Sequence, residues 1–174
     1  NNLYIFGTAG EGYAVTLTQF KEIVGIFREE TNKPDVHPMV GIISMSTALV
    51  VEKIAVAYDI GFRVFQIALP PWGVLTDNEC MTYFKDVCGS FPDAKFVHYN
   101  LPRPKRLLFA EDYARIEAEV PNLVGTKFTM ADPEECRKLV TQTEMQHFLG
   151  GGNYPFGSLH GECSILTSSG ALFP

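Results

Sequence analysis

The sequence has no long apolar run and no excess of positive charge. Its 174 residues carry 14 lysines and arginines against 20 acidic residues, which gives a formal net charge of −6. Nucleic acids and anionic membrane surfaces are bound by basic faces, so neither is an expected partner. No stretch approaches the roughly 20 apolar residues that a membrane-spanning helix needs, and no signal peptide is visible.

Paired cysteine and histidine motifs are also absent. The four cysteines, Cys80, Cys88, Cys136 and Cys163, include no Cys-x-x-Cys pair, and the four histidines show no His-x-x-x-His spacing. Neither a metal centre nor a redox motif is therefore predicted. In a chain of this apolar content the cysteines are expected to be buried or half-buried thiols in a reducing compartment. We expect a cytoplasmic protein.

What the chain does contain is a regular alternation of short apolar runs and longer amphipathic segments. The runs are rich in β-branched and aromatic residues, and several are apolar on both faces, which is typical of parallel strands that are covered on both sides. Seven strands are predicted: Leu3–Phe6, His37–Ile43, Phe62–Leu69, Ala94–Tyr99, Leu123–Phe128, Met145–Leu149 and Glu162–Thr167.

Five helices are predicted between these strands. In the first, apolar residues at Phe20, Ile23, Val24 and Phe27 form one helix face; Thr16 or Thr18 caps it, and it ends near Asn32. The others are expected over residues 47–60, 77–88 and 110–120 and from Asp132-Pro133 onward, with glycine at 61 and 89 ending two of them.

Successive strand–helix–strand units favour a (β/α)₈ TIM barrel over an open doubly wound sheet. Seven strands are one short of a barrel, and 174 residues are fewer than a barrel usually has. We expect one α/β domain over residues 1–174, a barrel that is incomplete in this chain and lacks its first strand and its last helices. The connection from Met145 to Glu162 is too short for an ordinary helix, so it is a single turn or residues are absent there.

Lys127 is the residue with the clearest chemical meaning. It ends the apolar run 123–128, and an ammonium is costly to bury without a partner, which favours the neutral amine. A neutral amine attacks carbonyl groups and forms a Schiff base. The alternative is a lysine whose stem covers apolar surface while its charge reaches water.

Two further motifs stand where strands end, which is the active-site face of such a barrel. Gly7-Thr8-Ala9-Gly10-Glu11-Gly12 is a loop whose backbone N–H groups can approach a carboxylate, or simply a tight turn. Tyr99, in Tyr-Asn-Leu-Pro, is a proton carrier or a packing aromatic. The Thr8 hydroxyl either bridges Tyr99 to other groups or bonds its own backbone.

These three motifs, in this order, resemble the pyruvate-type class I aldolase and lyase superfamily of dihydrodipicolinate synthase and N-acetylneuraminate lyase. Residues 7–12 match the family's glycine loop, Tyr99 to Pro102 its Tyr-Asn-x-Pro, and Gly125-Thr126-Lys127 its Gly-x-Lys. The resemblance covers nearly the whole chain, from the family's second strand to its eighth, and residues 161–174 look like the last-strand segment.

The resemblance implies a role for each residue. Lys127 forms the Schiff base with the C2 carbonyl of a 2-oxo acid, Tyr99 shuttles protons, and Thr8 orients Tyr99. Backbone N–H groups of Ala9 and Gly10 hold the substrate carboxylate. It also implies that neither a metal nor an organic cofactor is needed, because the protonated imine is the electron sink.

Three positions depart from the family pattern. Ala9 replaces a hydroxyl residue of the loop, and Pro104 stands where the synthases have an arginine. Trp72 aligns with the tyrosine that those synthases contribute to a neighbouring subunit's active site. Its ring is expected either to line the binding site of a bulky substrate or to pack at a subunit contact. These changes make lysine biosynthesis an unexpected role for this chain.

The sequence therefore predicts a lyase that joins or cleaves a carbon–carbon bond, or eliminates water, on a 2-oxo acid such as pyruvate. The second substrate is expected to be an aldehyde or a sugar acid, and the resemblance implies a homodimer or homotetramer. Two alternatives remain: a 2-oxo-acid-binding or regulatory member of the fold without turnover, and a barrel with a structural lysine and unrelated activity.

Overall fold

The computed structural model describes residues 1–129 and 132–168 of the chain. Seven parallel strands form one sheet in the order β1 to β7, so each strand pairs with the next one along the chain. The strands are β1 (Asn2–Ile5), β2 (His37–Ile42), β3 (Val64–Ile67), β4 (Lys95–Asn100), β5 (Leu123–Phe128), β6 (Gln146–Leu149) and β7 (Cys163–Ile165). The helices are α1 (Leu17–Thr31), α2 (Thr47–Asp59), α3 (Asp77–Gly89), α4 (Ala110–Glu119), α5 (Pro133–Gln142) and α6 (Tyr154–Gly157).

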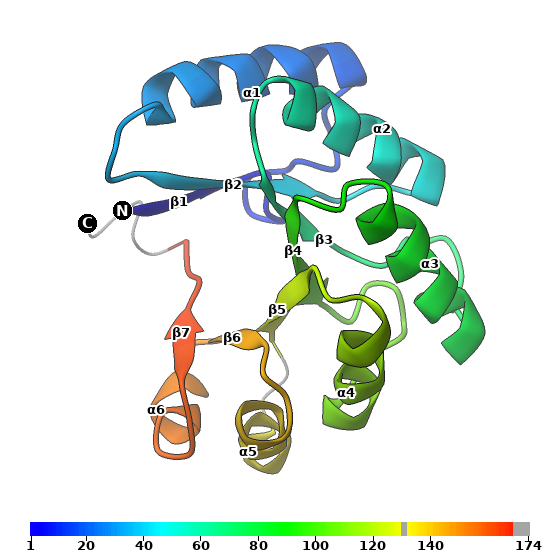
Figure 1. The fold of residues 1–174 in the computed structure, drawn as a ribbon, viewed down its shortest axis with the longest axis vertical. Helices are drawn as coiled ribbons and strands as arrows, with labels where there is room; N and C mark the ends of the chain where they lie inside the picture. The colour runs from blue at the N-terminus through cyan, green and yellow to red at the C-terminus, as the bar shows by residue number, and fades with distance from the viewer. Residues whose placement is uncertain (130–131, 169–174) are drawn as a thin grey trace.

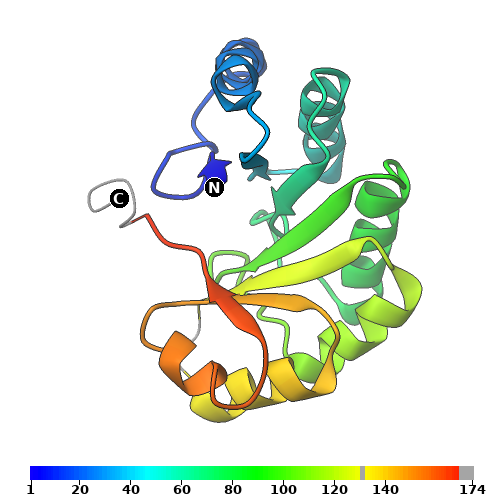
Figure 2. The same cartoon turned by 60° about the vertical axis from the view of Figure 1, so that its left-hand side comes forward.

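The sheet curls, and the helices lie along its outer side (Figure 1). β1 and β7 are its two edges, and the inner side is open in the turned view of Figure 2. The predicted fold, an α/β (β/α)₈ barrel that is incomplete in this chain, is confirmed: the seven strands make a partial barrel. All seven predicted strands are present, with bounds that differ by at most two residues.

Side chains that point outward from the strands form the core beneath the helices. Phe65, Phe96, Ile42 and Ile67 are fully buried there. Burying one such side chain contributes about 1.5–3 kcal/mol to folding. The inward positions alternate with these and are likewise in register across the sheet: Gly41 pairs with Gln66, and Gln66 with Val97. The alternation expected of a strand therefore separates a packing face from the face that can carry a site.

The helices begin where the sequence offers caps. Thr16 rather than Thr18 caps α1, and the Gln19 side chain reciprocates in a capping box; Thr76 and Glu79 do the same for α3. Asp132 caps α5 with Pro133 at its first position, as predicted. The predicted stop at Gly89 is early by one residue, because α3 includes Gly89 and is capped by Ser90.

The connection between β6 and β7 is a single helical turn, α6. This settles the two possibilities in favour of the single turn. Gly157 in this turn lies so close to the sheet that a Cβ atom there would fall 2.3 Å from Leu149 Cδ1. A larger residue there would push the Leu149 side chain aside, so the glycine lets the short connection pack closely against β6.

The cysteines lie where the sequence predicts: Cys80, Cys88 and Cys136 are buried and Cys163 is half-buried, each as a free thiol. Within the described residues, no helix is both long enough and apolar enough to span a bilayer.

Candidate active site

Lys127 and Tyr99 face each other across neighbouring strands. Tyr99 on β4 pairs in register with Lys127 on β5, so both side chains point to the inner side of the sheet. The Lys127 Nζ atom lies 4.4 Å from the centre of the Tyr99 ring, within the range of a cation–π contact. Both side chains are half-buried. The structure thus brings together the two residues that the resemblance names for imine formation and proton transfer.

A second phenol, which sequence reasoning missed, approaches the same amine. Tyr4 on β1 lies with its ring centre 6.0 Å from Lys127 Nζ, and its hydroxyl donates to Gln66 Oε1 on β3 at 2.5 Å. Burial raises the pKa of Tyr4, and the nearby Tyr99 phenol raises it further. Tyr4 is therefore a hydrogen-bond donor that keeps its proton near neutral pH.

Two glycines make room for the Tyr4 ring. A Cβ atom at Gly41 would fall 2.6 Å from Tyr4 Oη, and one at Gly7 would fall 2.8 Å from Tyr4 Cε1. The sequence signal for this arrangement is a tyrosine in the short strand β1 and a glutamine inside the otherwise apolar strand β3. Their mutual contact depends on the curl of the sheet, which the sequence does not specify.

The glycine loop after β1 is built on unusual backbone conformations. Phe6 has φ +63° and Glu11 has φ +51°, and the Phe6 ring is buried against Phe20. Gly12 lies so close to this turn that a Cβ atom there would fall 2.5 Å from Phe6 Cβ. Ala9 and Gly10 are exposed, and their N–H groups make no hydrogen bond to the backbone of the described residues.

The Thr8 side chain lies in the glycine loop without a hydrogen-bond partner among the described residues. Its Oγ1 atom is buried. The structure therefore contains no hydrogen bond from Thr8 to Tyr99, and the role of Thr8 in orienting that phenol stays a prediction.

Asn100, the residue after Tyr99, fixes the loop that follows β4. Its Nδ2 donates to the Leu108 carbonyl at 2.7 Å, and its Oδ1 accepts from the Leu108 N–H at 3.1 Å. Both ends of the loop are thereby held by one buried side chain. The Tyr-Asn-Leu-Pro motif thus carries a structural residue directly beside the predicted proton carrier.

The positions that depart from the family pattern differ in how exposed they are. Trp72 is 85% exposed, so its ring is not packed against Lys127 or Tyr99. Pro104 is buried, and Arg106 is held by Asp77 at 2.6 Å and by the Leu75 carbonyl. Arg103 lies with its guanidinium 5.9 Å from the centre of the ring of Tyr13, the residue that follows the glycine loop.

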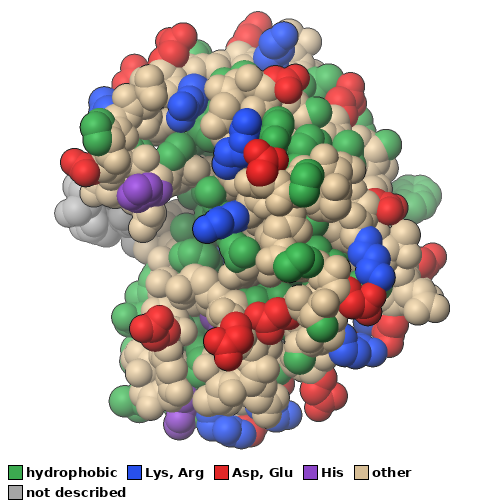
Figure 3. All heavy atoms as spheres, viewed as in Figure 1, with side chains coloured by type: hydrophobic (Ala, Val, Ile, Leu, Met, Phe, Trp, Pro, Cys, Tyr) green, Lys and Arg blue, Asp and Glu red, His purple; other side chains and the backbone are tan. Residues whose placement is uncertain are grey.

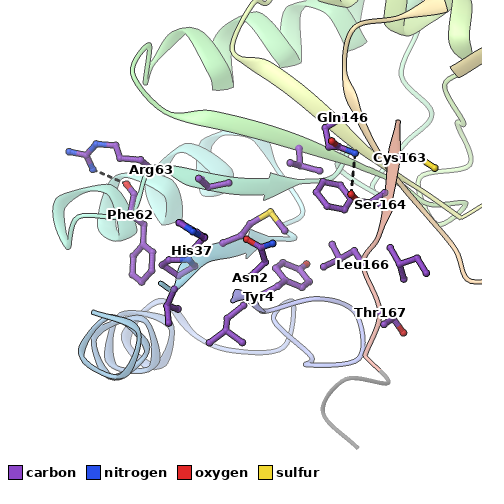
Figure 4. Close-up of a pocket in the computed structure, with 18 of the residues that line it drawn as sticks. Asn2, Tyr4, His37, Phe62, Arg63, Gln146, Cys163, Ser164, Leu166 and Thr167 are labelled. Atoms are coloured by element: carbon purple, nitrogen blue, oxygen red, sulfur yellow. Dashed lines mark hydrogen bonds between the residues drawn. The ribbon is translucent and has the colours of Figure 1, made fainter. Parts of the chain in front are cut away.

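Two cavities lie near these residues. One, of about 950 Å³, is bordered by Tyr4, Gln146 and Ser164 and opens between the β1 and β7 sides of the sheet (Figure 4). The space-filling view shows a notch on that side of the molecule, with basic and acidic side chains interspersed over the helices (Figure 3). The other, of about 480 Å³, is lined by Thr8 and Arg103. Neither lining includes Lys127 or Tyr99.

Two buried histidines lie outside this site. His98 Nδ1 lies 2.7 Å from Tyr113 Oη, and His147 lies between the hydroxyls of Thr126 and Thr143. Burial lowers the pKa of His98 to about 3 and that of His147 to about 4. Both are neutral hydrogen-bonding groups of the outer core, not acid–base candidates at neutral pH.

A comparison with protein families agrees with the three motifs and the fold. The model of the dihydrodipicolinate synthetase family matches residues 1–157. The chain belongs to this family. The resemblance to this family that the three motifs predict is therefore confirmed.

Curated relatives are similar at low identity. The chain is 23% identical to an N-acetylneuraminate lyase of Lactiplantibacillus plantarum over 76% of its length and 44% of the relative's. It is also 23% identical to a 4-hydroxy-tetrahydrodipicolinate synthase of Ralstonia nicotianae, over 89% of this chain and 52% of the relative. The identity to a trans-O-hydroxybenzylidenepyruvate hydratase-aldolase of Pseudomonas putida is 23%, over 74% of this chain and 38% of the relative. The chain thus spans about half the length of these relatives or less.

Solved structures share the fold. A dihydrodipicolinate synthase from Aquifex aeolicus superposes with a TM-score of 0.87 at 17% identity, over 99% of this chain and 60% of that one. A prophage protein of Escherichia coli K12, solved in complex with pyruvate, superposes with a TM-score of 0.86 at 17% identity, over 94% of this chain and 57% of that one. At these identities the likeness concerns the fold.

Proposed function

We propose that this family member is a Schiff-base-forming lyase that acts on a 2-oxo acid such as pyruvate and makes or breaks a carbon–carbon bond. The observation that carries the proposal is the pairing of Lys127 with Tyr99, an amine 4.4 Å from a phenol ring on the inner side of the partial barrel. Membership of the dihydrodipicolinate synthetase family and the pyruvate bound to a protein of the same fold support it.

In this proposal, Lys127 Nζ attacks the C2 carbonyl of the 2-oxo acid and displaces water to give an imine. The Tyr99 hydroxyl delivers the proton that turns the carbonyl oxygen into the leaving water. The protonated imine then accepts the electron pair from the neighbouring carbon, which lets a bond at C3 break or form. Hydrolysis of the imine returns the amine and the product.

The glycine loop supplies the site for the substrate carboxylate. The N–H groups of Ala9 and Gly10 are free of backbone partners in the described structure, and two such donors on adjacent residues suit an anion. Thr8 is the hydroxyl residue of the same loop and is assigned to Tyr99 in this scheme. Trp72, being exposed, is assigned to the rim, where a bulky second substrate or another subunit would meet it.

Lysine biosynthesis is not the proposed role, because Ala9 and Pro104 remove polar groups that the synthases use. The second substrate is proposed to be an aldehyde or a sugar acid, and the assembly a homodimer or homotetramer. No metal or organic cofactor is proposed, and we place the reaction in the cytoplasm.

The test is turnover. The protein is supplied with a panel of aldol adducts of pyruvate, and pyruvate release is followed by coupled reduction to lactate. Release from at least one adduct, abolished in Lys127→Ala, is the expected result. The Lys85→Ala variant is the matched control, since Lys85 pairs with Glu119 on the outer surface.

A second candidate function is 2-oxo-acid binding without turnover. The same three departures favour it, because Ala9, Pro104 and the exposed Trp72 each take a polar or relaying group away from the site. Capture of pyruvate on Lys127 without turnover of any adduct would identify a binding protein. No capture of any 2-oxo acid would leave Lys127 as a structural residue of an unrelated activity.

A further inference from the structure

The Lys127 amine is in contact with two ring faces and with no opposite charge. Its Nζ atom lies 4.4 Å from the centre of the Tyr99 ring and 6.0 Å from the centre of the Tyr4 ring. Lys127 takes part in none of the ion pairs among the described residues. The residue in register with it on β6 is Phe148, and Ser164 follows on β7; neither carries a charge. Positive charge on this nitrogen is therefore met by the faces of two phenols.

The Tyr4 ring is fixed in place although β1 is an edge strand. Its hydroxyl donates to Gln66 Oε1 at 2.5 Å, which ties the ring to β3, two strands away. Gly7 and Gly41 leave the room that the ring occupies, since Cβ atoms there would fall 2.8 Å and 2.6 Å from it. A ring held in this way needs no rearrangement when charge forms beside it, which is the condition for electrostatic stabilisation in a reaction.

The Tyr4 hydroxyl is not a second proton carrier. It is engaged with Gln66, and burial raises the pKa of Tyr4, so the phenol is neutral at pH 7. A neutral phenol attracts a cation through the electron-rich face of its ring, and this attraction grows as water is excluded. What Tyr4 offers the amine is therefore the face of its ring.

We propose, building on the proposed function, that Tyr4 is a positioning residue of the reaction, whose ring stabilises positive charge on Lys127 Nζ together with the Tyr99 ring. The neutral amine, the ketone and one proton give the protonated imine and one water. The positive charge then stays on the nitrogen until the neighbouring carbon–carbon bond changes. A carboxylate in the same place would hold the charge more strongly and keep the amine protonated before the substrate arrives. Two ring faces favour the cation less strongly and leave neutral amine to attack.

The experiment changes the charge distribution of the ring and keeps its shape. Tyr4 is replaced by phenylalanine and by phenylalanines with one, two and three ring fluorines, which withdraw electron density from the ring face. All members of the series lack the hydroxyl, so Tyr4→Phe is the reference and the lost bond to Gln66 is common to all. Imine formation is measured by borohydride reduction over a range of pyruvate concentrations, followed by mass spectrometry. The concentration for half-maximal trapping should rise with each fluorine, by about 2- to 30-fold over the series.

A second measurement needs no pyruvate. Cyanate adds to neutral amines, so its rate of addition to Lys127, mapped by mass spectrometry after digestion, reports the neutral form. A less electron-rich ring stabilises the ammonium less, and addition at pH 7 should therefore become faster with each fluorine. The same fluorinated series at Phe91, which packs against Tyr58 on the outer side of the molecule, is the control and should change neither measurement.

A rate of cyanate addition that does not depend on the number of fluorines would overturn the proposal and leave Tyr4 as a packing residue. Unchanged trapping across the series, in a protein that traps pyruvate, would overturn it as well. If the unaltered protein traps no pyruvate, the proposed function fails, and the cyanate series alone decides the role of Tyr4. Where circular dichroism shows that Tyr4→Phe does not fold, fluorinated tyrosines, which keep the hydroxyl, supply the same series.

Discussion

The Lys127 amine lies 4.4 Å from the centre of the Tyr99 ring, and β4 and β5 hold the two residues in register. A strand pair is a rigid support, so the amine and the phenol are placed relative to each other before any substrate arrives. Such preorganisation is what acid–base catalysis on a covalent intermediate needs.

Tyr99→Phe tests the proton carrier. The ring and its contact with Lys127 remain, but the hydroxyl is lost, so capture of pyruvate should slow by about 100-fold or more. The rate of capture is measured by reducing the imine with borohydride at successive times and determining the mass of the protein by mass spectrometry. Tyr58→Phe is the control, because its hydroxyl bonds Asp93 on the outer side of the molecule. Equal rates in the Tyr99→Phe variant and the unaltered protein would remove Tyr99 from the mechanism.

The contact between Tyr4 and Gln66 should be energetically coupled. Tyr4→Phe leaves Gln66 Oε1 without its donor, and Gln66→Leu leaves the Tyr4 hydroxyl unpaired. Each change should lower the free energy of unfolding by about 1–3 kcal/mol. The double variant should lose clearly less than the sum, which urea denaturation of all four proteins measures. If the losses of the two single variants simply add up in the double variant, the contact between Tyr4 and Gln66 contributes nothing to stability.

Asn100→Asp should loosen the loop after β4. The replacement keeps the shape and the acceptor, but the donation from Nδ2 to the Leu108 carbonyl is lost and a buried charge is introduced. We expect a loss of at least about 2 kcal/mol in unfolding free energy. Hydrogen exchange at the Leu108 amide should rise as well. Unchanged protection of that amide would contradict the clamp.

Stability should fall on acidification because of the two buried histidines. Their folded-state pKa values, about 3 for His98 and about 4 for His147, lie below the ordinary value of 6.5. Below pH 6.5 the unfolded chain therefore binds protons that the native state does not. The free energy of unfolding should drop by up to about 1.4 kcal/mol per pH unit for each histidine, down to about pH 4.

Urea titrations at pH 7, 6 and 5 measure this slope. His147→Gln, which removes one of the two groups, should make the slope shallower. A stability that stays level from pH 7 to pH 5 would show that these histidines accept protons in the folded protein.

The sequence predicts the strands and most of the helices because their signals are local. Runs such as Leu123–Phe128 are apolar on both faces, and caps such as Thr16 and Asp132 mark helix starts. The pairing of Tyr99 with Lys127 also follows from sequence, since both end adjacent parallel strands. Side-chain contacts across the curled sheet do not follow from local signals, which is why Tyr4 was missed.

Lys53 shows the same limit in a helix. A lysine among Val50, Ile54 and Ala57 reads as a charged residue at the edge of an apolar helix face, and nothing in α2 indicates that the glycine loop covers it. Thr8 is the converse case. Its place in the motif is plain, but the turn at Phe6 leaves its hydroxyl without a described partner. In both cases the conformation of the glycine loop, not the residue type, determines what surrounds the side chain.

The most direct test of the account is the site of pyruvate capture. The protein is incubated with pyruvate, reduced with borohydride, digested, and mapped by mass spectrometry, alongside Lys127→Arg, which keeps the charge and cannot form the imine. We expect one reduced adduct, on Lys127, and none in the variant. No adduct, or adducts spread over exposed lysines such as Lys85 and Lys95 with Lys127 unmodified, would contradict it.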